Sequence, residues 1–334
     1  MRIFRATAVL AATLLLATAC ASSDTPKGDP DDSKVEFPTK RITLIIPYTA
    51  GGPTDTVGRA IARYFDEKLG WSVVPENMPG AGAAVGMRAL VNSPEDGYTL
   101  AITGSNAAVV TPILVADAGY DGDDFVNIGV IAEYPYIIAV GAESGIKDAR
   151  DFFDRVKANP GSVTLAAPSG TGQISVDIQR LEQQGATIGI VPFDGNAEAT
   201  AAMLGNNVHG VIQVASQDTL TQIESGKAIP IAVLSAERAS FLPDVPTLTE
   251  LGFKGINLGT SYFALGAPAG VPSSTIASLE KALEEALNDP ATQKVIGSVF
   301  IPSKFIGAKE LDGLFAAQRD SYGPTIRELL ASKK

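Results

Sequence analysis

Two glycine-rich turns carry the residue types best suited to hold a small anion. The first is Pro47-Tyr-Thr-Ala-Gly-Gly-Pro-Thr-Asp, and the second is Pro168-Ser-Gly-Thr-Gly-Gln. Each opens a helical pattern, so its glycines let the backbone approach a ligand and free N–H groups point at the bound molecule. Neither turn contains Lys or Arg. We therefore expect backbone amides and the hydroxyls of Thr54, Ser169 and Thr171 to hold a carboxylate.

Motifs for other chemistries are incomplete. Gly80-Ala-Gly-Ala-Ala-Val-Gly spaces its third glycine one residue too far for a dinucleotide fingerprint, and Gly226-Lys-Ala does not complete a phosphate-binding loop. The sequence has no Gly-x-Ser-x-Gly elbow and pairs no base with a nucleophile. His209 is the single histidine and has no second ligand at metal spacing. We expect no enzyme activity, no metal and no cofactor.

Composition points to a globular protein of two lobes. The chain has 334 residues, of which 45% are hydrophobic and 19% are charged. Its length exceeds what one small core needs. The formal net charge of -11 makes nucleic acid a poor partner, because the phosphate backbone is itself negative.

The first twenty residues read as a secretory signal. Arg2 and Arg5 precede a short apolar run that ends in Ala-Thr-Ala-Cys. This ending resembles a lipobox, which predicts a lipoprotein signal peptide over 1–20 and lipidation of Cys20. The alternative is an ordinary signal peptide cut near Ala19. Residues 21–37 are polar and acidic, with Pro and Gly, and predict a flexible tether to the cell membrane.

The body alternates β-rich runs with helical patterns, beginning with a strand over 41–47 and a helical stripe through Leu69. Separate strands are expected over 127–132 and 136–140. This order predicts an α/β fold of two lobes, each a mostly parallel sheet covered by helices. Ligands in such sheets bind at the carboxyl ends of strands, so two lobes can place those ends across a cleft. We assign 38–140 plus 262–334 to lobe 1 and 141–261 to lobe 2.

Six motifs in order carry a resemblance to a known family. They are Ile45-Ile-Pro-Tyr-Thr-Ala-Gly-Gly-Pro-Thr-Asp, Glu76-Asn-Met-Pro-Gly-Ala-Gly, Asp96-Gly-Tyr-Thr-Leu, Val191-Pro-Phe-Asp-Gly, Leu242-Pro-Asp-Val-Pro-Thr-Leu-Thr-Glu-Leu-Gly and Ala267-Pro-Ala-Gly-Val-Pro. From about Arg41 to the C-terminus the chain resembles the solute receptors of tripartite tricarboxylate transporters, also called Bug receptors. The resemblance implies a periplasmic-binding-protein-like Venus flytrap that closes on an organic acid.

The resemblance also implies a set of ligand-binding residues. In the family the two glycine-rich turns hold the carboxylate, partly through water, and the far side of the cleft sets selectivity. Asp55 is expected to cap its helix or orient water, because like charges repel. Tyr48 stands where the family often has Phe, and His209 stands where the family tends to have Asp. The implied residues are Tyr48, Gly52, Pro53, Thr54, Asp55, Ser169, Gly170, Thr171 and Gly172, with Ser105, Asn106, Asp194, Gly195 and Asn196 on the far side.

These observations predict an extracytoplasmic, lipid-anchored, monomeric receptor for a small organic carboxylate. Its expected partners are the membrane permease subunits of a tripartite transporter. Alternatives are a ligand-sensing lipoprotein that feeds a signalling partner, an extracytoplasmic enzyme acting on a carboxylate, and a structural surface lipoprotein with an empty cleft. A base or nucleophile beside the cleft would favour the enzyme, and a neighbouring permease gene would favour transport.

Overall fold

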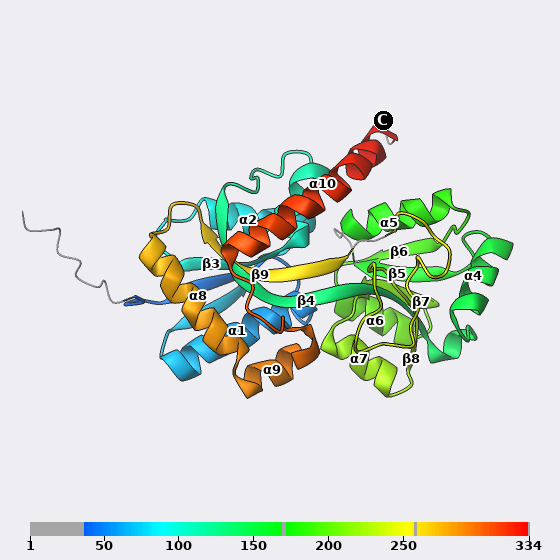
Figure 1. Ribbon diagram of the computed structural model, residues 1–334, viewed down its shortest axis with the longest axis horizontal. Coiled ribbons are helices and arrows are strands. Elements are labelled where there is room, and N and C mark those ends of the chain that lie inside the picture. The colour runs from blue at the N-terminus through cyan, green and yellow to red at the C-terminus, as the bar shows by residue number, and fades with distance from the viewer. Residues whose placement is uncertain (1–36, 169–171, 257–258, 333–334) are drawn as a thin grey trace, which may run out of the picture. The chain divides into compact units, whose positions relative to one another are not determined.

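The structure, a computed structural model, describes residues 37–168, 172–256 and 259–332. Within these residues nine strands form one sheet in the order β2-β1-β3-β9-β4-β7-β5-β6, with β8 also paired to β4. Helices pack around the sheet on both sides of the long strands β4 and β9, which gives two lobes (Figure 1). The α/β fold of two lobes predicted from the sequence is confirmed.

The first lobe is built on three parallel strands, with β1 in the middle. The side chains of β1 are almost all buried, because helices cover both faces of a parallel sheet. Helix α1 begins with Pro53, buries Val57, Ile61 and Phe65 on one face, and ends at Gly70 in the left-handed conformation. The elements of this lobe are β1 (Ile42–Ile46), β2 (Val73–Asn77), β3 (Thr99–Gly104), α1 (Pro53–Leu69), α2 (Ala84–Val91), α8 (Ser273–Leu287) and α9 (Pro290–Ile296).

The second lobe repeats this plan, with β5 between β6 and β7 in parallel register. Its helix α4 begins where the Asp148 side chain accepts a hydrogen bond of 2.9 Å from the Asp151 N–H, a standard helix cap. The elements of this lobe are β5 (Thr164–Pro168), β6 (Gly189–Phe193), β7 (Gly210–Val214), β8 (Ala228–Val233), α4 (Ala149–Ala158), α5 (Gly172–Gln183), α6 (Asn196–Leu204) and α7 (Gln217–Glu224).

Two strands run from one lobe into the other. β4 (Phe125–Gly141) pairs antiparallel with β9 (Thr260–Pro268) as far as Pro135, and from Tyr136 onward with β7 and β8. The two separate strands expected over 127–132 and 136–140 are therefore one, and that prediction is wrong. Pro135 lies where β4 changes partners, so its missing N–H does not interrupt a central ladder. The sheet is consequently mixed, parallel within each lobe and antiparallel along the crossing strands.

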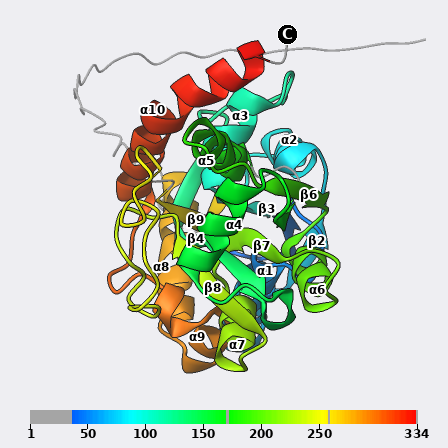
Figure 2. The same cartoon turned by 90° about the vertical axis from the view of Figure 1, so that its right-hand side faces the viewer.

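A long C-terminal helix, α10 (Ala308–Ser332), also contacts both lobes. It packs against β4 and reaches α3 and α5, as Figures 1 and 2 show. Arg180 on α5 donates a hydrogen bond of 2.9 Å to the Thr325 hydroxyl on α10. The remaining short helices are η1 (Ala81–Ala83), η2 (Asn106–Val110), α3 (Thr111–Leu114), η3 (Ala142–Ser144) and η4 (Ser298–Phe300).

The described residues from Phe37 onward form one compact unit. The lobe limits assigned at 140 and 262 therefore stay predictions, although β4 changes partners and β9 begins close to them. The predicted signal peptide, Cys20 and all but the last residue of the tether lie outside the described residues. No helix in the described ranges is both long and apolar enough to span a membrane.

Candidate functional site

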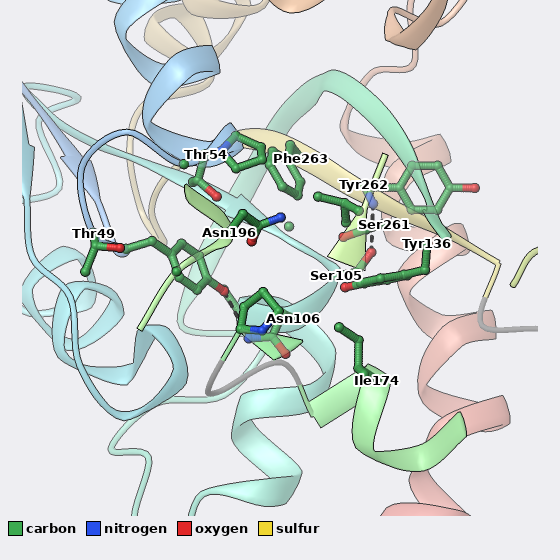
Figure 3. Close-up of a pocket in the computed structure, with 18 of the residues that line it drawn as sticks. Thr49, Thr54, Ser105, Asn106, Tyr136, Ile174, Asn196, Ser261, Tyr262 and Phe263 are labelled. Atoms are coloured by element: carbon green, nitrogen blue, oxygen red, sulfur yellow. Dashed lines mark hydrogen bonds between the residues drawn. The ribbon is translucent and has the colours of Figure 1, made fainter. Parts of the chain in front are cut away.

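A cavity of about 60 Å³ lies where the two lobes face each other (Figure 3). Its walls come from the turn after β1, the end of β3, both crossing strands and the strand ends of the second lobe. Parallel strands in both lobes point their carboxyl ends at this place, as expected for an open α/β sheet. The lining residues are Tyr48, Thr49, Gly52, Pro53, Thr54, Thr103, Gly104, Ser105, Asn106, Ala107, Tyr136, Pro168, Ile174, Asp194, Gly195, Asn196, Val214, Ser261, Tyr262 and Phe263.

The turn between β1 and α1 forms one wall. Gly52 has extended backbone and precedes Pro53, the first residue of α1, while the Thr54 side chain is nearly buried beside the cavity. Proline at the first helical position leaves the following N–H groups free to point at a bound anion. The turn therefore offers backbone amides and one hydroxyl to an acceptor.

Asp55 holds this turn in place from behind. Its carboxylate accepts hydrogen bonds from the Gly51 N–H (3.0 Å), from Arg59 Nε (2.8 Å) and from Asn77 Nδ2 (3.0 Å). Burial acts to raise the pKa of Asp55, and the hydrogen bonds from Arg59, Gly51 and Asn77 outweigh it, so the pKa lies below its usual value. Asp55 does not line the cavity. The expectation that it caps its helix or orients water stays a prediction.

Tyr48 and Asn106 meet at the cavity wall. Asn106 Nδ2 donates a hydrogen bond of 3.0 Å to the Tyr48 hydroxyl oxygen. Burial raises the pKa of Tyr48 to about 12, although the hydrogen bond from Asn106 acts to lower it. Tyr48 is therefore neutral at physiological pH and does not repel an anionic ligand.

The crossing strands close the back of the cavity. The Tyr262 N–H donates 3.0 Å to the Ser105 hydroxyl oxygen, and the Tyr136 hydroxyl donates 2.8 Å to Gln173 Oε1 at the start of α5. Ser105 is fully buried, so its hydroxyl stands in a fixed position. These bonds fix polar groups from β3, β4 and β9 around one space.

The turn between β6 and α6 forms the opposite wall. Asn196, the first residue of α6, directs its side chain into the cavity, and its Nδ2 is buried without a hydrogen-bond partner among the described residues (Figure 3). A Cβ added at Gly195 would lie 2.7 Å from Thr49 Oγ1 of the first lobe. The two turns thus lie against each other at Thr49 and Gly195.

The lining carries few charged side chains. Among the lining residues that the structure describes, none is Lys, Arg or His, and Asp194 supplies the one carboxylate. Asp194 is exposed at the edge. Nor does the described part of the chain hold a cluster of three or more His, Cys, Asp or Glu side chains that could bind a metal. Any anion here would be held by amides and hydroxyls.

Residues 57–329 match the family model described as "Tripartite tricarboxylate transporter family receptor". The chain belongs to this family. The resemblance given by the six sequence motifs is thereby confirmed.

Individual relatives agree with the family match. A protein of the TAR-I ttuE-ttuC' intergenic region of Agrobacterium vitis, named UPF0065, is 31% identical over 297 residues, covering 87% of this chain and 85% of the relative. The protein BugT of Bordetella pertussis is 28% identical over 302 residues, covering 89% of this chain and 92% of BugT. The structure of the periplasmic binding protein BugD superposes with a TM-score of 0.78 at 27% identity, covering 87% of this chain and 98% of BugD.

Nine of the predicted site residues lie together around the cavity. They are Tyr48, Gly52, Pro53, Thr54, Ser105, Asn106, Asp194, Gly195 and Asn196. Their binding of a ligand stays a prediction. Three others, Ser169, Gly170 and Thr171, and the lipidation site Cys20, lie outside the described residues.

Two predicted residues lie outside the lining, Asp55 and Gly172. Gly172 begins α5 and is buried, and a Cβ there would lie 2.5 Å from the side chains of both Val110 and Leu114 in the first lobe. The structure therefore gives Gly172 a place in the packing between lobes instead of a contact with the cavity.

The sequence reasoning missed the lining residues that come from the crossing strands and from strand ends. Tyr136, Ser261, Tyr262 and Phe263 belong to runs that read only as buried strands, and no local motif marks them. Thr49 was within the first turn and its hydroxyl could have been included. The other missed residues are Thr103, Gly104, Ala107, Pro168, Ile174 and Val214.

Proposed function

We propose that this protein is an extracytoplasmic receptor that captures a small organic carboxylate between its lobes and delivers it to a membrane transporter. The observation that carries the proposal is the cavity itself. Both lobes and both crossing strands contribute to it, and, apart from Asp194 at its edge, its described polar groups are neutral amides and hydroxyls. Family membership supports the same conclusion.

In this proposal the carboxylate binds at the start of α1. The free N–H groups at the start of α1 and the Thr54 hydroxyl hold the two oxygens of the carboxylate. Asn196 Nδ2 donates to the ligand from the second lobe. A hydrogen bond to a charged group contributes about 1.5–3 kcal/mol. Four or five of them, less the entropy of capture, are consistent with affinity on the order of micromolar.

Closure of the lobes then buries the ligand. β4 and β9 are the strands that connect the lobes, so we assign them the hinge. The lobes lie against each other at Thr49 and Gly195, and at Gly172 beside Val110 and Leu114. A ligand that contacts both lobes favours the closed form, because it interacts with the second lobe only there.

The proposed partners are the permease subunits of a tripartite tricarboxylate-type transporter. Lipidation of Cys20 would tether a monomeric receptor at the membrane through residues 21–37, with no need for a membrane-spanning helix. MatC from Rhodopseudomonas palustris, which shares the fold with a TM-score of 0.77 at 23% identity, has been solved with malate. Small acids of this kind belong in the first panel of test ligands.

A thermal-shift screen tests the binding. The purified chain is heated with mono-, di- and tricarboxylates, amino acids and neutral vitamins, after removal of any retained ligand. We expect one carboxylate class to raise the melting temperature, because a ligand that binds only the native state stabilises it. Thr54→Val should reduce the shift, and the matched change Thr221→Val on an exposed turn of α7 should not. No shift with any carboxylate would overturn the proposal.

Uptake measurements separate transport from signalling. Cells that lack this chain should lose uptake of the identified acid and regain it when the chain is restored. Uptake that does not depend on the chain would favour the sensing lipoprotein instead.

A further inference from the structure

A second hollow adjoins the ligand cavity and shares Tyr48, Thr49 and Asp194 with it. Its volume is about 550 Å³, against about 60 Å³ for the ligand cavity. We propose that the Tyr48 ring is the partition between the two spaces and sets the longest ligand that the cavity accepts. This specificity role rests on the proposed receptor function.

Tyr48 is fixed at both ends, as a partition must be. Its hydroxyl oxygen accepts 3.0 Å from Asn106 Nδ2, and its carbonyl oxygen accepts 3.1 Å from Asn77 Nδ2. The side chain is half-buried and packs against the core. Its position therefore does not depend on a bound ligand.

The wall of the second hollow is a strained turn tied to the same asparagine. Ala81, Gly82 and Ala83 have φ values of 46°, 62° and 87°, in the left-handed region that alanine disfavours. The Gly82 carbonyl accepts hydrogen bonds from the Thr111 hydroxyl and from Asn106 Nδ2. Asn106 Nδ2 donates to both the Tyr48 hydroxyl and the Gly82 carbonyl, so the partition and the wall of the hollow are held by the same side chain.

The lining of the second hollow indicates what would enter if the partition were removed. Pro47, Pro79, Leu114 and Val115 make it largely apolar, and Asp194 lies at the edge shared with the ligand cavity. Burial of an apolar ligand chain in this hollow would add binding free energy, whereas the second carboxylate of a dicarboxylate would be repelled by the negative charge of Asp194. Removal of the ring should therefore admit longer monocarboxylates in preference to longer dicarboxylates.

The test is a chain-length series on the full chain. Affinities are measured calorimetrically for linear monocarboxylates from acetate to decanoate and for α,ω-dicarboxylates from malonate to sebacate. The variants are Tyr48→Phe, which keeps the ring, Tyr48→Ala, which removes it, and Tyr48→Leu, which preserves more of the packing in case the alanine variant does not fold. Tyr48→Ala combined with Val115→Trp refills the hollow and serves as the matched control.

We expect the wild type and Tyr48→Phe to share one length limit. Tyr48→Ala should pass that limit, with affinity for monocarboxylates rising about fourfold for each further methylene. Tyr48→Leu should also bind acids longer than the wild-type limit, with a smaller rise in affinity for each methylene. Adding Val115→Trp to Tyr48→Ala should restore the wild-type limit. The partition is overturned if Tyr48→Ala and Tyr48→Leu keep the wild-type limit while still binding short acids, or if the wild type shows no limit. No binding of any acid by any of these proteins overturns the receptor function and the partition with it.

Discussion

The turn after β1 and the turn after β6 face the same cavity but are held very differently. In the first turn, Asp55 accepts hydrogen bonds from Gly51, Arg59 and Asn77. In the second turn, the Asp194 N–H donates a hydrogen bond of 3.3 Å to Glu198 Oε2, and Asn196 Nδ2 has no described partner. The difference shows that the first turn is held by bonds within the protein, whereas the second turn keeps a buried donor, Asn196 Nδ2, without a described protein partner.

The largest effect should come from removing the anchor of the first turn. Asp55→Ala leaves the Gly51 N–H and Arg59 Nε without the Asp55 acceptor and leaves Asn77 Nδ2 with the Tyr48 carbonyl alone. We therefore expect a loss of about 3 kcal/mol in the free energy of unfolding. Ligand affinity should fall about 100-fold, since each 1.4 kcal/mol of lost binding free energy is a factor of ten. Urea unfolding and calorimetry measure the two quantities. Asp194 is exposed, so Asp194→Ala should change affinity by less than about threefold and the free energy of unfolding by less than about 0.5 kcal/mol. A larger loss for Asp194→Ala than for Asp55→Ala would reverse the comparison.

Crowding the contact between the turns should have the next largest effect. Gly195→Ala places a Cβ 2.7 Å from Thr49 Oγ1, so we expect closure to be hindered and affinity to fall about tenfold. Thr49→Ala removes that oxygen and leaves the Thr49 Cβ at 4.0 Å, so the double variant should bind more tightly than Gly195→Ala alone. Equal affinities of the single and double variants would show that this contact does not limit closure.

Asn196→Ala tests the turn after β6 by itself. Its Nδ2 has no described protein partner to lose, so the free energy of unfolding should change by less than about 0.5 kcal/mol. Affinity for a carboxylate should fall about tenfold, because one hydrogen bond to the charged ligand, about 1.5 kcal/mol, is lost. A loss of stability without a loss of affinity would mean that Asn196 serves the fold and not the ligand.

The smallest expected effect is on pH dependence. The pKa of Asp55 is lowered in the folded state, so the stability that it contributes is present above its unfolded pKa and is lost as pH falls through its folded pKa. Asp55→Asn removes the charge-assisted part of these hydrogen bonds, about 1 kcal/mol. Unfolding curves should therefore separate the wild type from Asp55→Asn at pH 7 and converge at strongly acidic pH. A constant separation at every pH would exclude a role for the carboxylate charge.

The sequence by itself determined most of the elements and the first wall of the cavity, and the resemblance to the family supplied the residues of the second wall. Glycine turns that precede helices are local features, and the same residues that mark them, such as Gly52, Thr54 and Gly195, line the cavity. The alternation of apolar runs with helical stripes was enough to predict the two-lobed α/β fold, because burial against a parallel sheet leaves a pattern in the chain.

Tertiary structure decided what lies between those walls. Tyr136 on β4 and Ser261, Tyr262 and Phe263 on β9 reach the cavity because two strands cross from lobe to lobe, and strand pairing across more than a hundred residues leaves no local pattern. The direction of the Asp55 side chain, away from the cavity and toward Arg59 and Asn77, was likewise decided by neighbours that fold beside it. Residue type and spacing set which groups are available, and long-range packing sets where they point.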